Sequence, residues 1–444
     1  MSPLRRLALL LAAAIMGGAC GVTRPAPPPP PGTFTPVRHV LANGVPVIVQ
    51  EHRGSDVVAL QLWVRAGARD EATGEAGLAH YLEHMLFKGT TVRPGGFIER
   101  EVEGVGGRMN AGTSWDYTFY HAVLPASRTR AGIEMLADIA VNATLDATVL
   151  DAEKRVVLQE IRRSEDTPRG VLVRRLYGLV FDGHPYGRPV LGTPEVIRGL
   201  TRETLRGFYR RHYVPESFAL VVVGAVDPRE ALAAAREAFE RLPRSGLKRL
   251  PVAAPQATPP HRDELPRPGS LAWLGLAWPA PKIDHGDTPA MDLLVSVLGR
   301  ARSSRLVQAL RERRGLVSSI SASFSALEGA GIVMVTAQLA PGDLARAEAA
   351  IVGEVERLRE AGVTEAERRR AVTAAEAAHE FSVETAEGRA LALGRAETVW
   401  SLDEELTYQN RLRAISTEQL RFTARRYLDP ARYARLAVVP PGRP

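Results

Sequence analysis

The spacing of apolar and polar residues divides most of the chain into strands and helices. Apolar residues flank the turn at Asn43-Gly44, which predicts a hairpin over residues 40–49. Residues 57–66 alternate as a strand, and residues 108–124 are rich in the β-branched and aromatic residues typical of strands. Helical spacing of the apolar residues predicts four helices, over residues 77–87, 97–105, 130–145 and 148–165.

An internal repeat predicts two domains of similar structure. Residues 201–215 match residues 416–430 without a gap, at an offset of 215. A strand-like run follows each copy, at Phe218–Val223 and Tyr433–Val439. The chain therefore reads as one duplicated module, joined by a proline-rich segment.

The helix predicted at residues 77–87 carries the clearest candidate chemistry. His80 and His84 are four residues apart, so they lie on one face of the helix. Two imidazoles placed in this way can bind one metal ion, and neutral imidazole is a common zinc ligand. Glu83 lies beside them and can take a proton from a water molecule that the metal polarises. This order, H-x-x-E-H, is the inverse of the commoner H-E-x-x-H.

A third protein ligand is expected, because catalytic zinc has three protein ligands and an open position. Glu160 is the best candidate, in a second helical stretch that begins near Asp151. Glu153 lies two helical turns earlier on the same face and could support the site by a hydrogen bond to a ligand. In the second copy of the repeat, the matching positions fall near Val295–Gly299 and Ala374, which cannot bind a metal. One copy is therefore expected to carry the chemistry.

H-x-x-E-H followed after 75 residues by Glu160 resembles the pitrilysin (M16) family of zinc metallopeptidases. The resemblance covers roughly residues 37 to 440 and is strongest to the branch of the mitochondrial processing peptidases and their bacterial relatives. It implies an α+β fold of two duplicated domains, each a mixed or antiparallel sheet packed with helices, in a clamshell arrangement. It also implies one Zn²⁺ per chain.

Two further sets of site residues follow from the resemblance. Asn110 and Ala111 match a sheet edge that pairs with the substrate backbone in the family, as an edge strand can do; a plain structural hairpin is the alternative. Arg311 matches an arginine of the family's second domain that reaches the substrate; a solvated helix residue is the alternative. The family has a tyrosine seven residues after that arginine, whereas this chain has Ser318. Substrate binding by the second domain is thus in question.

The N-terminus has the features of an export signal. Arg5 and Arg6 precede an apolar run that is too short to span a bilayer. Cys20, the only cysteine, follows small residues and resembles the lipidation site of a bacterial lipoprotein; ordinary signal cleavage is the alternative. A proline run then predicts an extended tether. The predicted segments are an export signal at 1–19, the tether at 20–36, a catalytic domain at 37–245, a linker at 246–268 and an inactive domain at 269–444.

Charge narrows the possible functions only slightly. The net charge is +7, but the basic residues are spread along the chain, which argues against a nucleic-acid-binding arm. The combined prediction is a zinc endopeptidase of extended or unfolded peptides, exported to a bacterial periplasm and lipid-anchored through Cys20. It would act as a homodimer or with an M16-like partner subunit. The alternative is a non-proteolytic binding or assembly subunit with a vestigial metal site.

Overall fold

The computed structural model describes residues 35–256 and 260–441, and the chain from Pro36 onward forms one compact unit. The predicted export signal, Cys20 and almost all of the predicted tether lie outside the described residues. No helix in the described ranges is both long and apolar enough to cross a membrane.

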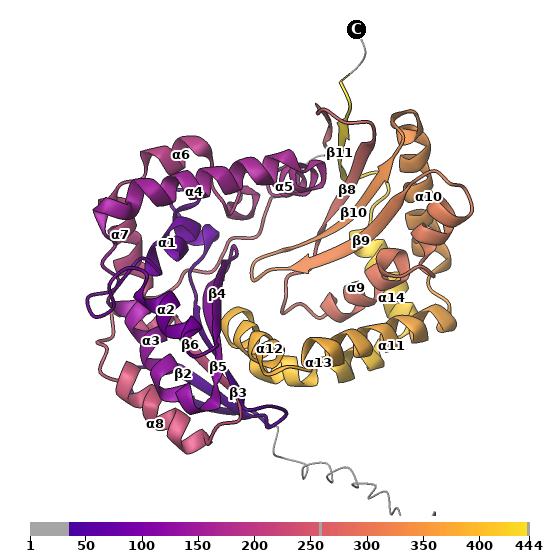
Figure 1. Cartoon of the computed structure of the whole chain (residues 1–444). Coiled ribbons are helices and arrows are strands. Elements are labelled where there is room, and N and C mark those ends of the chain that lie inside the picture. Colours follow the sequence, from indigo (N-terminus) through magenta and orange to yellow (C-terminus); the bar gives the residue numbers. More distant parts are fainter. Residues whose placement is uncertain (1–34, 257–259, 442–444) are drawn as a thin grey trace, which may run out of the picture. The chain divides into compact units, whose positions relative to one another are not determined.

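The first half of this unit is built on a six-stranded mixed sheet with the order β1-β2-β6-β3-β5-β4 (Figure 1). Its strands are β1 (Val37–Val40), β2 (Pro46–Glu51), β3 (Val57–Val64), β4 (Arg108–Thr113), β5 (Thr118–Pro125) and β6 (Phe218–Gly224). The predicted hairpin is confirmed as β1 and β2. The region 108–124, read as one strand from its composition, is two antiparallel strands, because residues 114–117 turn the chain back. Strand β4 thereby lies at the edge of the sheet.

Eight α-helices accompany this sheet within the described part of the first half. They are α1 (Leu78–Leu86), α2 (Phe97–Glu103), α3 (Thr129–Val141), α4 (Ala147–Asp166), α5 (Pro168–Val180), α6 (Pro194–Gly199), α7 (Arg202–His212) and α8 (Pro228–Phe239). The four predicted helices are confirmed as α1 to α4, with ends shifted by a few residues. The core lies between one face of the sheet and α1, α3, α7 and α8.

The second half is built on a five-stranded sheet with the order β7-β11-β8-β10-β9. Its strands are β7 (Arg262–Pro266), β8 (Ala272–Ala280), β9 (Ser319–Ala326), β10 (Gly331–Leu339) and β11 (Ala434–Val439). Its helices are α9 (Thr288–Val295), η6 (Ser296–Arg300), η7 (Val307–Glu312), α10 (Leu344–Ala361), α11 (Glu365–Ser382), α12 (Ala386–Val399), α13 (Leu402–Ala414) and α14 (Thr417–Tyr427). Strand β7 falls inside the segment predicted to be a linker. The prediction misses this strand because its polar sequence shows no alternation of apolar residues.

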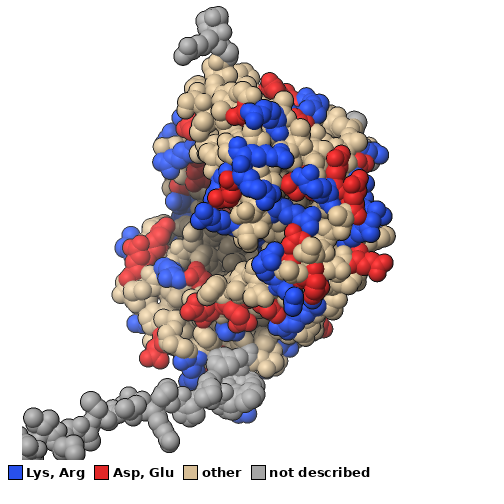
Figure 2. Space-filling view, turned by 90° about the vertical axis from the view of Figure 1, so that its right-hand side faces the viewer, with Lys and Arg blue, Asp and Glu red and all other residues tan. Residues whose placement is uncertain are grey.

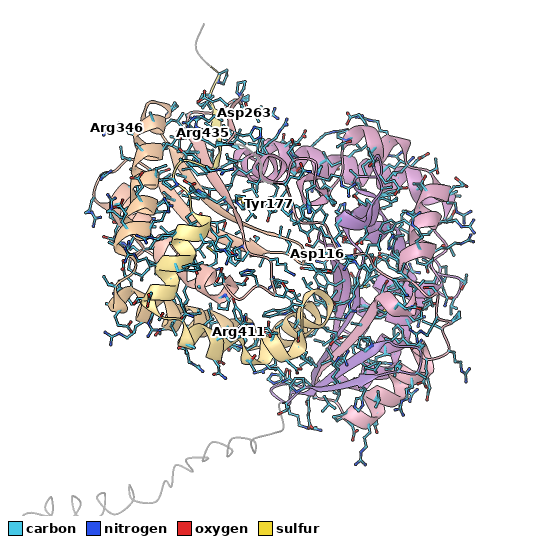
Figure 3. All side chains as sticks on the ribbon, turned by 180° about the vertical axis from the view of Figure 1, so that it is seen from behind. Asp116, Tyr177, Asp263, Arg346, Arg411 and Arg435 are labelled. Carbon is cyan, nitrogen blue, oxygen red and sulfur yellow. The ribbon has the colours of Figure 1, made fainter. Side chains whose placement is uncertain are left out.

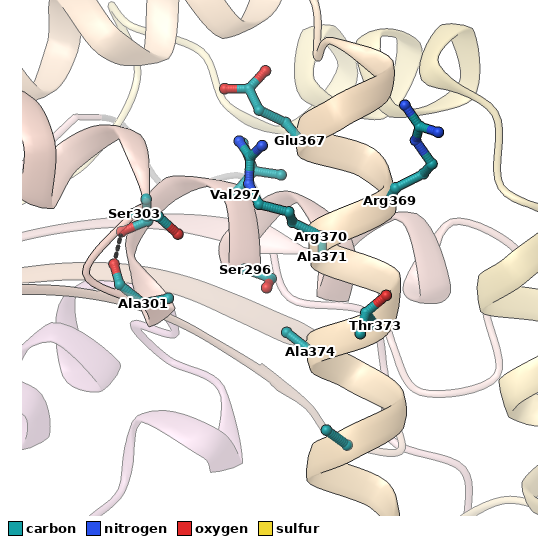
Figure 4. A pocket seen from close by; sticks show the side chains of 12 residues that line it. Ser296, Val297, Ala301, Ser303, Glu367, Arg369, Arg370, Ala371, Thr373 and Ala374 are labelled. Atoms are coloured by element: carbon teal, nitrogen blue, oxygen red, sulfur yellow. Dashed lines mark hydrogen bonds between the residues drawn. The ribbon is translucent and has the colours of Figure 1, made fainter.

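The structure follows the predicted duplication closely. Helices α7 and α14 begin and end 215 residues apart, and each leads into a strand of its own sheet. The region matching His80 and His84 lies on α9 and η6, and Ala374 lies on α11. Val297 and Ala374 line one cavity of about 470 Å³ (Figure 4). The second half therefore keeps the arrangement of the predicted metal site without metal ligands at these positions.

Each half covers a sheet of the other half with one helix. Helix α12 of the second half packs on the first sheet, where its residues Ala390 and Leu393 share a hydrophobic cluster with the buried Trp63. Gly394 allows this close approach, since a Cβ atom there would lie 1.9 Å from Nε1 of Trp63. Helix α5 of the first half packs in the same manner on β8 and β11. This exchange of helices ties the two halves together.

Buried charges also join the halves. The guanidinium group of Arg69 lies 3.2 Å from Asp116 and 3.1 Å from Glu328 of the second half. Tyr186 donates a hydrogen bond of 2.7 Å to Asp116, which Figure 3 places near the middle of the molecule. Arg249 bridges Asp70 and Glu328 at 2.8 and 3.0 Å. The carboxylates of this cluster are therefore paired, as buried charges require.

The halves enclose a cavity of about 600 Å³ with aromatic side chains from both, among them Trp115, Phe324 and Trp400. Figure 2 shows basic and acidic side chains interspersed around a central hollow. Two duplicated halves that face each other across a cavity confirm the predicted α+β clamshell.

One carboxylate of the second half predicts an acid-sensitive contribution to stability. Glu367, on the wall of the cavity in Figure 4, binds Arg305 through two hydrogen bonds of 2.7 and 2.8 Å. These bonds lower the pKa of Glu367 from 4.5 to about 2. Between these values the unfolded chain binds more protons than the native one, so the free energy of unfolding rises with pH across this window.

Replacement Glu367→Gln is expected to lower the free energy of unfolding at pH 7 by about 1–2 kcal/mol, after allowance for solvent screening. The difference in the free energy of unfolding between the variant and wild type should shrink as pH falls below 4.5. In that range the unfolded chain takes up the proton that the native carboxylate does not, which reduces the stabilisation by Glu367. Urea unfolding at pH 7, 5 and 4 measures this. Glu380→Gln, at an exposed position of the same helix, is the control; an unchanged difference at pH 4 would contradict the assignment.

Candidate metal centre

Helix α1 begins in a buried setting that fixes its direction. Its N-cap, Gly77, has a φ of 95°, a conformation that glycine adopts without strain. The carboxylate of Glu71 accepts hydrogen bonds of 3.1 and 2.9 Å from the backbone N–H groups of Gly77 and Ala79. Burial raises the pKa of Glu71 to about 8. Glu71 could not be predicted as part of the site, because no periodicity in the sequence links a loop carboxylate to the helix that it caps.

Helix α4 lies against α1 and brings the predicted ligands together. Tyr81 donates a hydrogen bond of 2.6 Å to the carbonyl oxygen of Leu150 and so locks the two helices in register. The Nε2 atoms of His80 and His84 each lie 3.5 Å from Oε2 of Glu160. One ligand atom from each of these three residues lies within 4.8 Å of the ligand atoms of the other two. Within the described ranges, no other histidine, cysteine or carboxylate group has this geometry.

The donor set fits a zinc ion. Burial and the neighbouring His84 lower the pKa of His80 to about 3, so its imidazole is neutral and can donate a lone pair. Nδ1 of His84 lies 3.3 Å from Oε2 of Glu153, and the other oxygen of Glu153 pairs with Lys88 at 2.9 Å. A carboxylate behind a histidine in this manner orients the ring and fixes its tautomer. His80, His84 and Glu160 thus present their donor atoms together, and Glu153 lies behind His84.

Glu83 lies next to these donors. Its carboxylate accepts a hydrogen bond from the hydroxyl of Thr113 on β4, and burial raises its pKa. Thr113 was not singled out from the sequence, although it lies in the same strand as Asn110. A buried carboxylate with one fixed donor is suited to accept a proton from a neighbouring water molecule.

A cavity of about 350 Å³ opens onto the candidate metal centre. It is lined by His80, Glu83, His84, Phe87, Lys88, Glu99, Met109, Asn110 and Glu160. All of these belong to the first half, and Met109 and Asn110 lie on the edge strand β4. An extended peptide paired with this edge would pass across the cavity.

The remaining predicted residues lie in different settings. Ala111 is on β4, where it packs against the core of the first half and does not line the cavity. Arg311 is on η7 of the second half, pairs with Glu312 at 2.8 Å and is not part of the cavity lining. The hydroxyl of Ser318 donates to the carbonyl oxygen of Gln338 at 3.0 Å. The described chain therefore does not bring Arg311 to its own candidate metal centre.

Two models of known protein families match this chain. Residues 47–194 match the family model described as insulinase (peptidase family M16), and residues 199–375 match the peptidase M16 inactive domain. The chain belongs to the M16 peptidase family. The second family model begins before α7, although α7 and β6 pack in the first half.

Individual relatives agree with this assignment. An uncharacterized zinc protease of Mycobacterium leprae is 33% identical over 69% of this chain and 70% of its own. An uncharacterized zinc protease of Mycobacterium tuberculosis is 30% identical over 94% of this chain and 96% of its own. The crystal structure of a protease from Helicobacter pylori superposes with a TM-score of 0.87 at 23% identity, covering 92% of this chain and all of the other. At that identity the likeness shows the fold.

Proposed function

We propose that this chain is a zinc-dependent endopeptidase that cleaves extended or unfolded peptides. One observation carries the proposal: two imidazole nitrogens and a carboxylate oxygen converge within 4.8 Å in a cavity that also holds Glu83. Relatives named zinc proteases support it.

His80, His84 and Glu160 would hold the zinc ion, which when bound supplies Lewis-acid polarisation of a water molecule and of the scissile carbonyl. Glu83 takes the proton of that water as the water attacks the carbonyl carbon, and then passes the proton to the leaving amine. Thr113 holds the carboxylate of Glu83 in place. Glu153 and Lys88 hold the ring of His84. These contacts fix the reacting groups before substrate arrives.

The edge of β4 would bind the peptide backbone as an added strand. Asn110 lies at the cavity, and its side chain already accepts a hydrogen bond of 2.9 Å from the N–H of Ala111. Backbone pairing is independent of side chains, so it suits substrates that are unfolded. Arg311 could contact such a substrate from a second subunit, since in its own chain it lies outside the cavity lining.

We also propose export to a periplasm and lipid anchoring at Cys20. The residues before Cys20 have the composition of a signal. A periplasmic protease of Escherichia coli has the same fold, with a TM-score of 0.74 at 22% identity. Its fold alone is shared, so the sequence of the N-terminus is the stronger support.

Hydrolysis of a quenched-fluorescent peptide library by the purified full-length chain tests the proposed activity. Cleavage should stop when a chelator removes the metal and should return when zinc is restored. Cleavage that persists in excess chelator would contradict zinc dependence. No cleavage by a chain that binds one zinc would favour the alternative of a binding or assembly subunit.

A further inference from the structure

A second cavity of about 340 Å³ lies between α4, α5 and the segment that precedes α6. Apolar, aromatic and arginine side chains form much of its lining, notably Trp115, Tyr177, Leu191, Arg169, Arg174 and Arg188. We call it the arginine cavity.

Three chain segments connect the arginine cavity to the residues of the metal centre. Ser164 lines it and lies one helical turn after Glu160 on α4. Trp115 follows Thr113, which binds Glu83, by two residues. Leu191 precedes Gly192, which packs against Gly77, the N-cap of α1. The two backbones are so close that a Cβ atom added to Gly77 would lie 2.7 Å from Cα of Gly192. Four residues of helix separate Glu160 from Ser164 by about 6 Å along the axis of α4. A peptide that extends from the metal centre along this helix would therefore meet the arginine cavity a few residues from the cleaved bond, at about 3.3 Å per residue.

The walls of the arginine cavity are held in place. The rings of Trp115 and Tyr177 stack with centroids 4.5 Å apart at an angle of 18°, and Figure 3 places Tyr177 near the middle of the molecule. Nε1 of Trp115 donates a hydrogen bond of 3.0 Å to the carbonyl oxygen of Arg188. This aromatic pair separates the arginine cavity from the larger cavity between the halves, which it also lines.

The charged side chains that line the arginine cavity differ from those that line the metal cavity. The metal cavity contains Glu83, Glu99 and Glu160, whereas the described lining of the arginine cavity contains no acidic residue. Arg169 has no hydrogen-bond or ion-pair partner among the described residues. Nε of Arg188 is buried without a partner in the same described ranges. Arg174 donates to Ser164 and Glu165, each at 3.2 Å, and the Nη atoms of Arg188 donate to backbone carbonyl oxygens. The guanidinium group of Arg169 and Nε of Arg188 are thus the donors that a bound anion could satisfy.

We propose that the arginine cavity is a substrate subsite that binds an acidic side chain within three residues of the cleaved bond. This inference rests on the proposed peptidase function. A carboxylate would accept hydrogen bonds from Arg169 and would share the guanidinium group of Arg174 with Glu165, which Arg174 binds at 3.2 Å. The methylenes of a glutamate would lie against Trp115 and Tyr177. Charge-assisted hydrogen bonds of this kind are stronger than neutral ones, so the subsite distinguishes glutamate from its amide.

Cleavage rates of a peptide series test this subsite. Each peptide carries Glu, Gln or Lys at one of the three positions on either side of the cleaved bond, with both termini capped so that no terminal carboxylate is present. At one position, on one side of the bond, kcat/KM for the Glu peptide should exceed that for the Gln peptide by about tenfold. The Lys peptide should be the poorest of the three.

The double variant Arg169→Glu/Arg174→Glu should reverse this order and cleave the Lys peptide faster than wild type does, a gain that a damaged protein would not show. Arg162→Glu/Arg175→Glu changes the net charge equally at exposed positions outside the cavity and should keep the wild-type order. Equal rates for Glu, Gln and Lys at every position, with cleavage intact, would overturn the subsite and leave the peptidase function standing. If wild type with bound zinc cleaves no peptide of the series or the library, the proposed function itself fails.

Discussion

Replacement Glu83→Gln is expected to lower kcat for peptide hydrolysis by about a thousandfold or more, within the upper range for a general base. The amide keeps the size of the side chain and can still accept the hydrogen bond from Thr113, but it cannot take a proton. Zinc binding should be unchanged, because the ligand atoms come from His80, His84 and Glu160. Single-turnover hydrolysis, with zinc content measured on the same samples, separates the two properties.

The matched control for this variant is Glu103→Gln, an exposed position on α2 outside the cavity lining. It should retain wild-type hydrolysis. If Glu83→Gln keeps more than about a tenth of the wild-type rate, a role for Glu83 as the general base is excluded.

Replacement Glu160→Ala is expected to weaken zinc binding by more than about a hundredfold, the upper range seen when only a partner behind a ligand is lost. It removes the one oxygen that lies 3.5 Å from both imidazole Nε2 atoms. Competition with a fluorescent zinc chelator measures the loss. Hydrolysis should fall in parallel and recover in part at high zinc concentration.

Asp166→Ala is the control for the loss of the Glu160 carboxylate. Asp166 is exposed at the end of the same helix and lies outside the cavity. The replacement Asp166→Ala removes the same negative charge as Glu160→Ala does, and it should leave the zinc affinity unchanged. An unchanged zinc affinity in Glu160→Ala would show that the third ligand lies elsewhere.

The local part of the site could be predicted from the sequence. Spacing of four residues on a helix places His80 and His84 on one face, and this holds wherever the helix packs. The duplication was visible as a fixed offset, and α7 and α14 keep it in the structure. Helical periodicity also located α4, which carries Glu153 and Glu160.

The long-range part could not be predicted in the same way. The packing of α12 on the first sheet depends on the close approach of Gly394 to Trp63, and that of α5 on the second sheet on the approach of Leu176 to Gly275. No periodicity in the sequence encodes either contact. Glu71 and Thr113 act through contacts between segments that are distant along the chain or lie in loops. The arginine cavity is formed by three separate segments, and its arginines are indistinguishable in the sequence from the many that face solvent.

The measurement that tests the central claim most directly is the rate of peptide hydrolysis by the metal-free full-length chain as zinc is added in known amounts. If His80, His84 and Glu160 hold a single catalytic ion, the rate rises in proportion to zinc and levels off at one equivalent per chain. Hydrolysis that is already complete without zinc, or that remains absent at one bound zinc per chain, would contradict the account.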